Sequence, residues 1–176
     1  MMVTSLFKLV ATGLLATVVS GSPALRSRGN DSGVEVPDDG FIYHPNNGTI
    51  SNTVYTYCKE DQTTEVQTSD ASPFIQDCQV LMNNIAGDGV WEVWQVSHQK
   101  QIAHYRSCAF GVEVEYVPMR ITQMVGNGDI MRAITNLIDA NAKAGRNSGG
   151  RVGGKGHWDC SAQGVFWSVY WNNKKW

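Results

Sequence analysis

Two stretches of the chain repeat their apolar residues at the spacing of an amphipathic helix. The first covers residues 73–85, with Ser72 before it as the predicted N-cap and Gly87 after its end. The second begins at Asp129, which we predict as its cap, and Gly145 follows its end. The apolar positions are Phe74, Ile75, Cys78, Leu81, Met82 and Ile85 in the first stretch and Ile130, Met131, Ile134, Leu137 and Ile138 in the second.

Strands are predicted where β-branched and aromatic residues gather or alternate with polar ones. The clearest alternation lies in residues 108–116, where Val112 and Val114 share one face and Glu113 and Glu115 share the other. The predicted strands are residues 54–57, 90–96, 101–105, 108–116, 121–125 and 165–171, and the glycine-rich residues 146–156 are predicted as a loop. The strands and helices do not alternate regularly, so we predict an α+β fold: a small antiparallel sheet with two helices packed on one face, held by two disulfides.

The first residues have the features of an export signal. Lys8 is the basic residue, residues 9–19 are mostly apolar, and small residues around Gly21 suit cleavage. The apolar stretch is shorter than the roughly 20 residues that span a bilayer, and no later stretch comes closer. We therefore predict a signal peptide over residues 1–21, a secreted, extracellular protein, and no transmembrane segment after the signal is removed.

The mature chain is predicted to have two parts. Residues 22–52 are rich in Gly, Pro, Asn, Asp and Ser, and this composition predicts a flexible leader. Asn30 and Asn47 each begin a glycosylation sequon in this leader and are candidate glycosylation sites. Residues 53–176 are predicted to form the folded domain.

Four cysteines follow the signal: Cys58, Cys78, Cys108 and Cys160. An even number in an exported chain predicts two disulfides, each adding roughly 2–4 kcal/mol, and no paired zinc-ligand spacing is present. Three pairings exist, and the sequence by itself does not choose among them. We predict Cys78–Cys108, because Cys78 lies on the apolar face of a helix that should cover the strand of Cys108, and Cys58–Cys160 as the remaining pair.

Charge argues against two classes of partner. The chain has a formal net charge of −2, and removing residues 1–21 leaves 13 basic and 16 acidic side chains, a net charge of −3. This balance gives no electrostatic reason to expect binding to nucleic acid or to an anionic membrane. We predict neither as a partner.

The motifs of enzymes and cofactor sites are missing or incomplete. Residues 149–155 resemble a phosphate-binding loop, but Gly156 stands where that loop needs Ser or Thr. No G-x-S-x-G or H-E-x-x-H motif occurs, so we predict no catalytic residue, no metal and no cofactor. Two weaker alternatives remain: an anion or partner held by the loop cations Arg146, Arg151 and Lys155, and a metal held by His104 and His157 if their strands pair.

Asp129 and the tryptophans are assigned structural roles. Because Asp129 is predicted as a helix cap, we expect its replacement by alanine to lower the free energy of unfolding by roughly 0.5–2 kcal/mol. Core positions are predicted for Trp91, Trp94, Trp158, Trp167 and Trp171, and an exposed position for Trp176. The alternative is exposed tryptophan for sugar stacking or a protein interface.

Five short motifs occur in a fixed order and contain three of the four cysteines. They are residues 72–78 (SPFIQDC), 103–112 (AHYRSCAFGV), 126–130 (GNGDI), 150–160 (GRVGGKGHWDC) and 167–170 (WSVY). In this order they resemble the necrosis-inducing-factor family of fungal secreted effectors, whose founder is an extracellular effector protein of the tomato leaf-mould fungus. One departure is Arg106, because the family usually reads Tyr-Gly-Thr-Cys where this chain has Tyr-Arg-Ser-Cys.

The resemblance implies a secreted, non-enzymatic effector linked to virulence or host cell death. Its partner would be a host or microbial protein or a cell-wall component, and its target would lie in a host or a competing microbe. The alternative functions are a cell-wall glycan-binding module, a degraded hydrolase, or a killer-toxin-like antimicrobial protein.

Overall fold

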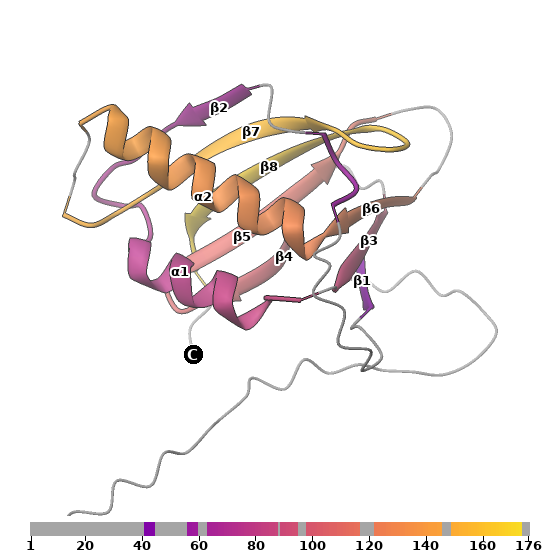
Figure 1. The fold of residues 1–176 in the computed structure, drawn as a ribbon, viewed down its shortest axis with the longest axis horizontal. Coiled ribbons are helices and arrows are strands. Elements are labelled where there is room, and N and C mark those ends of the chain that lie inside the picture. Colours follow the sequence, from indigo (N-terminus) through magenta and orange to yellow (C-terminus); the bar gives the residue numbers. More distant parts are fainter. Residues whose placement is uncertain are drawn as a thin grey trace, which may run out of the picture. The chain divides into compact units, whose positions relative to one another are not determined.

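The computed structural model describes residues 41–44, 56–59, 63–87, 89–94, 98–116, 122–145 and 149–173, which form a mostly β fold (Figure 1). These residues contain two antiparallel sheets, one with the strand order β1-β3-β6 and one with the order β2-β7-β8-β5-β4. The elements are β1 (Phe41–His44), β2 (Thr63–Val66), α1 (Ile75–Asn84), β3 (Val90–Trp94), β4 (Lys100–Tyr105), β5 (Cys108–Val114), β6 (Thr122–Gly126), α2 (Asn127–Lys143), β7 (Gly154–Asp159) and β8 (Gly164–Trp171).

Both helices lie over one face of the five-stranded sheet (Figure 1). Helix α1 packs on β4 and β5, and α2 contacts β2, β6 and α1. Neither described helix covers the opposite face of this sheet, which we call the open face. Within the described residues, no helix is both long and apolar enough to cross a membrane.

The predicted fold class, α+β with a single small antiparallel sheet, is wrong. Strands β3 and β6, which we predicted as part of that sheet, pair with each other and with β1 in a second sheet. Alternation of apolar residues indicates which face of a strand is buried, but it carries no information about which strand is its neighbour. The correct description is a mostly β protein with two antiparallel sheets and two helices.

Three strands were not predicted. Strand β1 lies inside residues 22–52, the predicted leader, and its residues pair with β3 from Phe41↔Val93 to His44↔Val90. Strand β2 is short and polar, and β7 lies partly in the predicted glycine-rich loop. In β7, a Cβ added at Gly156 would overlap the Trp167 ring, so glycine is needed there for close packing. Because Gly154 and Gly156 have no side chains, β7 lacks the alternation of apolar and polar residues from which a strand is predicted.

The core lies between the helices and the five-stranded sheet, and aromatic rings fill its centre. The Phe110 ring lies 6.0 Å from the Trp158 ring and 6.1 Å from the Trp167 ring, and all three side chains are buried. Trp91 is buried beside β1, whereas Trp94 is half-buried. Trp171 is 38% exposed at the end of β8, so its predicted core position is wrong. Trp176 lies outside the described residues.

Two disulfides join elements that are distant in the sequence, and they pair the same cysteines as the prediction. Cys78 in α1 is bonded to Cys108 at the start of β5, and both are fully buried. Cys58 is bonded to Cys160 just after β7, and the Lys59 amide donates a hydrogen bond to the Asp159 carbonyl beside it (2.9 Å). The described residues contain no free cysteine.

The residues at the start of α1 hold the turn between β4 and β5. The Asp77 carboxylate accepts hydrogen bonds from the Ser107 amide (3.2 Å) and hydroxyl (2.5 Å), and the Phe74 amide donates to the same hydroxyl oxygen (3.0 Å). The prediction of Ser72 as the N-cap is wrong. The N-cap is Phe74, and the Ser72 hydroxyl instead accepts from the Ser69 amide (2.9 Å) in the preceding turn.

Arg106 is the first residue of the tight turn between β4 and β5. Its φ is +44°, and it is the one non-glycine with positive φ among the described residues. Glycine favours this conformation because it has no Cβ to clash with the backbone. The glycine that the family usually has here therefore fits the backbone better than arginine does.

We expect Arg106→Gly to raise the free energy of unfolding by about 1 kcal/mol, because the left-handed conformation costs a residue with a side chain roughly 1–2 kcal/mol. Urea unfolding would measure the change. Arg106→Ala is the matched control, because it removes the guanidinium, 5.4 Å from the Tyr105 ring centroid, but keeps Cβ. Equal stabilities of the two variants would contradict the backbone explanation.

Candidate functional site

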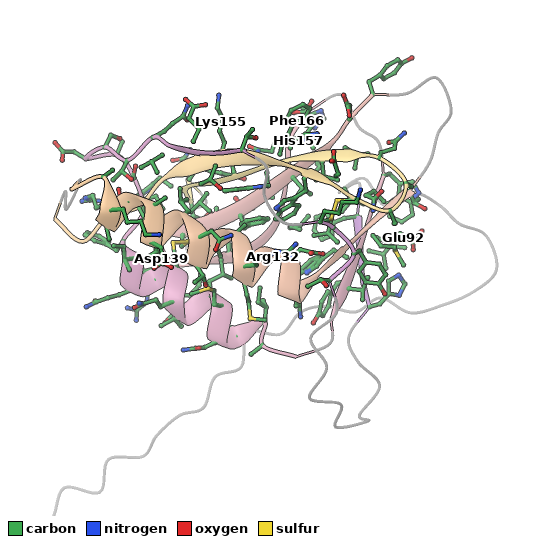
Figure 2. All side chains as sticks on the ribbon, turned by 45° about the horizontal axis from the view of Figure 1, so that its top comes forward. Glu92, Arg132, Asp139, Lys155, His157 and Phe166 are labelled. Carbon is green, nitrogen blue, oxygen red and sulfur yellow. A yellow bond between two sulfur atoms is a disulfide. The ribbon has the colours of Figure 1, made fainter. Side chains whose placement is uncertain are left out.

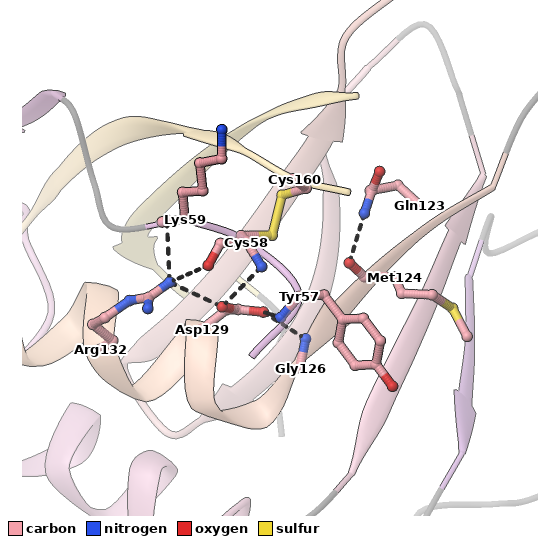
Figure 3. Close-up of polar contacts among 9 residues, drawn as sticks. All are labelled: Tyr57, Cys58, Lys59, Gln123, Met124, Gly126, Asp129, Arg132 and Cys160. Carbon is pink, nitrogen blue, oxygen red and sulfur yellow. Dashed lines mark hydrogen bonds and ion pairs between the residues drawn. A yellow bond between two sulfur atoms is a disulfide. The ribbon is translucent and has the colours of Figure 1, made fainter. Parts of the chain in front are cut away.

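Asp129 forms a buried polar network at the start of α2 (Figure 3). Its carboxylate accepts hydrogen bonds from the amides of Gly126 (2.9 Å), Tyr57 (2.8 Å) and Cys58 (3.3 Å), and its Oδ1 lies 3.0 Å from an Arg132 guanidinium nitrogen. Burial raises the pKa of Asp129, against the opposing effect of these donors and of Arg132. A side chain with no exposed surface and this many internal donors serves the fold and not a ligand.

The position of Asp129 in the helix differs from the prediction. Gly126 is the N-cap residue, and Asp129 is the third residue of α2, from which it reaches back to the Gly126 amide. It therefore does cap the helix, as one half of a capping box. The same carboxylate also holds the backbone before Cys58, an effect that the sequence spacing does not reveal.

The two histidines considered for a metal site lie on strands that do not pair. His104 is on β4 and His157 is on β7, with β5 and β8 between them. Three strand spacings are about 14 Å, too far for two ligands of one ion. His157 instead lies 4.0 Å from Glu115, and its ring centroid lies 4.8 Å from that of Phe166 in a tilted arrangement. Within the described ranges, no three His, Cys, Asp or Glu side chains are grouped as a metal site.

The loop cations are also separate from one another. Arg146 lies outside the described residues. Arg151 donates a hydrogen bond to the Ser72 carbonyl (2.7 Å), whereas Lys155, on β7, lies 3.5 Å from Glu65. Each of these two cations has a partner within the protein, so an anion held by this loop stays a prediction.

The open face has a mixed aromatic and polar surface. Along β8, Trp167 and Val169 face the core, while Phe166, Ser168 and Tyr170 alternate with them on the other side. Figure 2 shows Lys155, His157 and Phe166 on the side of the sheet away from α2. Phe166 is 47% exposed. The open face therefore presents partly exposed rings among hydroxyl, amide and charged groups.

A shallow groove begins on this face and passes round the end of β8, where Trp171 lines it from the helix side; we call it the β8 groove. One part has a volume of about 280 Å³, and the second part, at the strand end, has a volume of about 520 Å³. Ala71, Tyr170 and Trp171 line both parts, so the two parts are adjacent. The other side chains used below are Gln67, Gln99, Lys155 and Ser168 in the first part and Asp70 and Arg151 in the second.

Tyr170 lies across the neighbouring strand at the centre of the β8 groove. A Cβ added at Gly111 on β5 would lie 2.9 Å from Tyr170 Cε1 and 3.0 Å from its Oη, so glycine makes room for the ring. Gln99 lies beside it and donates a hydrogen bond to the Ser168 hydroxyl (2.6 Å). Burial raises the pKa of Tyr170 above its usual value of 10.0, so the phenol stays protonated at neutral pH and can donate a hydrogen bond.

Two exposed rings stand at the strand end of the groove. Phe74 is 40% exposed and Trp171 is 38% exposed, with their ring centroids 6.2 Å apart. The Arg151 guanidinium lies 4.1 Å from the Phe74 centroid and 5.6 Å from the Trp171 centroid, and its bond to Ser72 holds it there. This cluster positions the Trp171 ring before any ligand arrives.

The sequence analysis did not find the β8 groove. It placed Trp171 in the core and gave no role to Tyr170, Ser168 or Gln99. The strict alternation of β8 was the available signal, because it puts Ser168 and Tyr170 on the face opposite Trp167. The contributions of Gln67 and Gln99 could not be found in this way, because they lie outside the strands and reach the groove only through the fold.

Fold and surface together define a small, disulfide-linked, mostly β domain with an exposed aromatic groove. The family model described as "Pathogen effector; putative necrosis-inducing factor" matches residues 57–160, more than half of the chain. The chain belongs to this pathogen effector family, and the predicted resemblance is confirmed.

Two curated relatives from Penicillium expansum carry a similar segment. One, named "Probable chitinase LysM18", is 36% identical over 136 residues. The other, named "Secreted chitinase LysM12", is 29% identical over 138 residues. The matches cover 74% and 75% of this chain, but only 8% of each relative, so the chain corresponds to a small part of those proteins.

Proposed function

We propose that the chain is a secreted effector that acts by binding an extracellular target through the β8 groove and that it catalyses no reaction. The observation that carries this proposal is the groove itself, where the Tyr170 and Trp171 rings stand among amide and hydroxyl groups. Such a combination of apolar surface and a few oriented polar groups is typical of binding sites. The two cations that line it, Lys155 and Arg151, contact groups of the protein itself and do not converge on a common point.

Several features support a role outside the cell. The family is one of pathogen effectors, and one relative is named a secreted protein. The two disulfides suit an oxidising environment. A signal peptide over residues 1–21, and glycosylation at Asn30 and Asn47, are parts of the same proposal, as is a role in virulence.

The target class has two main candidates, a protein and a cell-wall component. Both curated relatives are named chitinases, which favours a cell-wall component. A killer-toxin-like antimicrobial role uses the same groove in this proposal, with the wall of a competing microbe as the target.

The proposal is tested by infiltrating the purified secreted protein into leaves and adding it to fungal cultures, with variants of the β8 groove. We expect Trp171→Ala to lower the activity roughly tenfold or more, because an exposed tryptophan that lines a binding surface commonly contributes a large share of its affinity. Phe166→Ala is the matched control, since Phe166 is an exposed ring of the same strand outside the groove. Full activity of Trp171→Ala would contradict the proposal.

We expect chelator treatment to leave the activity unchanged, because the proposal requires no metal. Reduction and alkylation of the disulfides should abolish activity and structure together. The circular dichroism spectrum, recorded on the same samples, separates the two effects. Loss of activity with chelator and an unchanged spectrum would mean that a metal site takes part.

A further inference from the structure

We infer that the β8 groove binds an uncharged polysaccharide chain, with sugar rings stacked on Trp171 and Tyr170; this inference rests on the proposed function. Sugar rings have an apolar face of C–H groups and a rim of hydroxyls. A site for them needs exposed aromatic rings next to groups that both donate and accept hydrogen bonds. The β8 groove supplies both kinds of group on one surface.

The aromatic part is formed by two rings that the fold holds in place. Tyr170 lies across Gly111, and the Trp171 ring is held beside Phe74 and Arg151. Tyr170 and Trp171 are consecutive residues and line both parts of the groove. Consecutive strand residues point to opposite faces, so Tyr170 reaches the groove from the open face and Trp171 from the helix side. A chain of sugar units that passes round the end of β8 would meet the Tyr170 ring and then the Trp171 ring. Because these rings are already ordered, binding costs little side-chain entropy.

The polar part consists of amides and hydroxyls. Gln67, Gln99, Ser168 and the protonated Tyr170 phenol line the first part of the groove. Each of these groups can donate and accept hydrogen bonds, as sugar hydroxyls do. A surface made mainly for a folded protein would have a larger apolar centre.

The charges argue for an uncharged ligand. Lys155 lies at the first part of the groove, and Glu65 lies 3.5 Å from it. Arg151 lies at the second part, which Asp70 also lines. Each part of the groove therefore has a cation with an acidic side chain near it, and no excess of positive charge is available for an acidic polymer.

The test is binding of the secreted chain to short oligosaccharides, measured by calorimetry and by co-sedimentation with the insoluble polymers. The uncharged probes are hexamers of N-acetylglucosamine, β-1,3-glucose and β-1,4-glucose, and the acidic probe is a galacturonate hexamer. We expect at least one uncharged hexamer to bind and the acidic hexamer not to bind. Binding of the acidic hexamer alone would overturn the inference, as would the absence of binding to all probes.

Variants locate the binding site. We expect Trp171→Ala to weaken binding of the uncharged hexamer about tenfold, and Tyr170→Phe to weaken it by a smaller factor, because it removes only the hydroxyl. Phe166→Ala should bind like the wild type. Thermal unfolding of each variant shows that the fold is kept. Equal binding by Trp171→Ala and the wild type would place the sugar elsewhere and overturn the inference.

The two proposals fail in different ways. If no oligosaccharide binds but Trp171→Ala still loses activity in the leaf or fungal assay, the groove is the binding site and its target is not a polysaccharide. If the oligosaccharide binds but Trp171→Ala keeps full activity in that assay, the sugar site exists and the proposed function is wrong.

Discussion

Replacing Cys58 and Cys160 together by alanine is expected to lower the free energy of unfolding by about 4–5 kcal/mol. The bond joins residues separated by 102 positions, so its loss restores a large conformational entropy to the unfolded chain. A domain of this size is commonly stable by only about 5–15 kcal/mol, so this change removes a large part of the total. Guanidinium unfolding under non-reducing conditions measures the difference.

The other disulfide is the matched comparison. Cys78 and Cys108 are separated by 30 positions, and their replacement by alanine should cost about 3–4 kcal/mol on the same entropy argument. The critical result is which of the two double replacements lowers the free energy of unfolding more. If removal of Cys78–Cys108 were the more costly change, packing of the buried pair against the core would outweigh loop length.

Asp129→Ala is expected to lower the free energy of unfolding by about 3–5 kcal/mol, more than the roughly 0.5–2 kcal/mol of a helix cap alone. The carboxylate is fully buried and accepts hydrogen bonds from three backbone amides, and it also contacts Arg132. Its removal leaves those amides without their acceptor, which costs the desolvation of each buried amide. Arg132 loses its carboxylate partner but keeps its hydrogen bonds to the Cys58 and Lys59 carbonyls. Chemical unfolding at neutral pH would measure the loss.

Asp139→Ala is the control for this prediction. Asp139 is exposed on the same helix, so its replacement should change the stability by no more than about 0.5 kcal/mol. Amide hydrogen exchange adds a local readout, because the amides of Tyr57 and Cys58 should exchange faster in Asp129→Ala. A loss within the range of a simple cap, with unchanged exchange at these amides, would mean that the network contributes nothing beyond the cap.

Local patterns predicted most of the regular elements. Both helices were predicted within a few residues of their bounds, because the spacing of their apolar residues identifies the buried face of a helix. Strands β5 and β8 were found for the same reason, with a period of two instead of 3.6. The unpredicted strands β1, β2 and β7 lack such stripes. They are strands because a neighbouring strand satisfies their backbone hydrogen bonds.

The site was less predictable than the fold. The sequence correctly suggested that Asp129 caps α2, but its contacts with Tyr57 and Cys58 join segments about 70 residues apart. The β8 groove combines Gln67, Gln99 and Tyr170 from three distant parts of the chain. No spacing rule relates these positions, since their proximity depends on which strands are neighbours.

The amino-acid sequence was enough to predict both helices, most of the strands and the family, whereas the predicted cysteine pairing was one of three that four cysteines allow. The tertiary structure decided that the strands form two sheets, that Trp171 is exposed and that a groove runs along β8. The physical reason is the range of the interactions. The apolar periodicity of a helix or strand depends only on the residues of that element. Strand pairing depends on backbone N–H and C=O groups, which are the same in nearly every residue. Which strands pair, and therefore which side chains share a surface, is settled only when the whole chain packs.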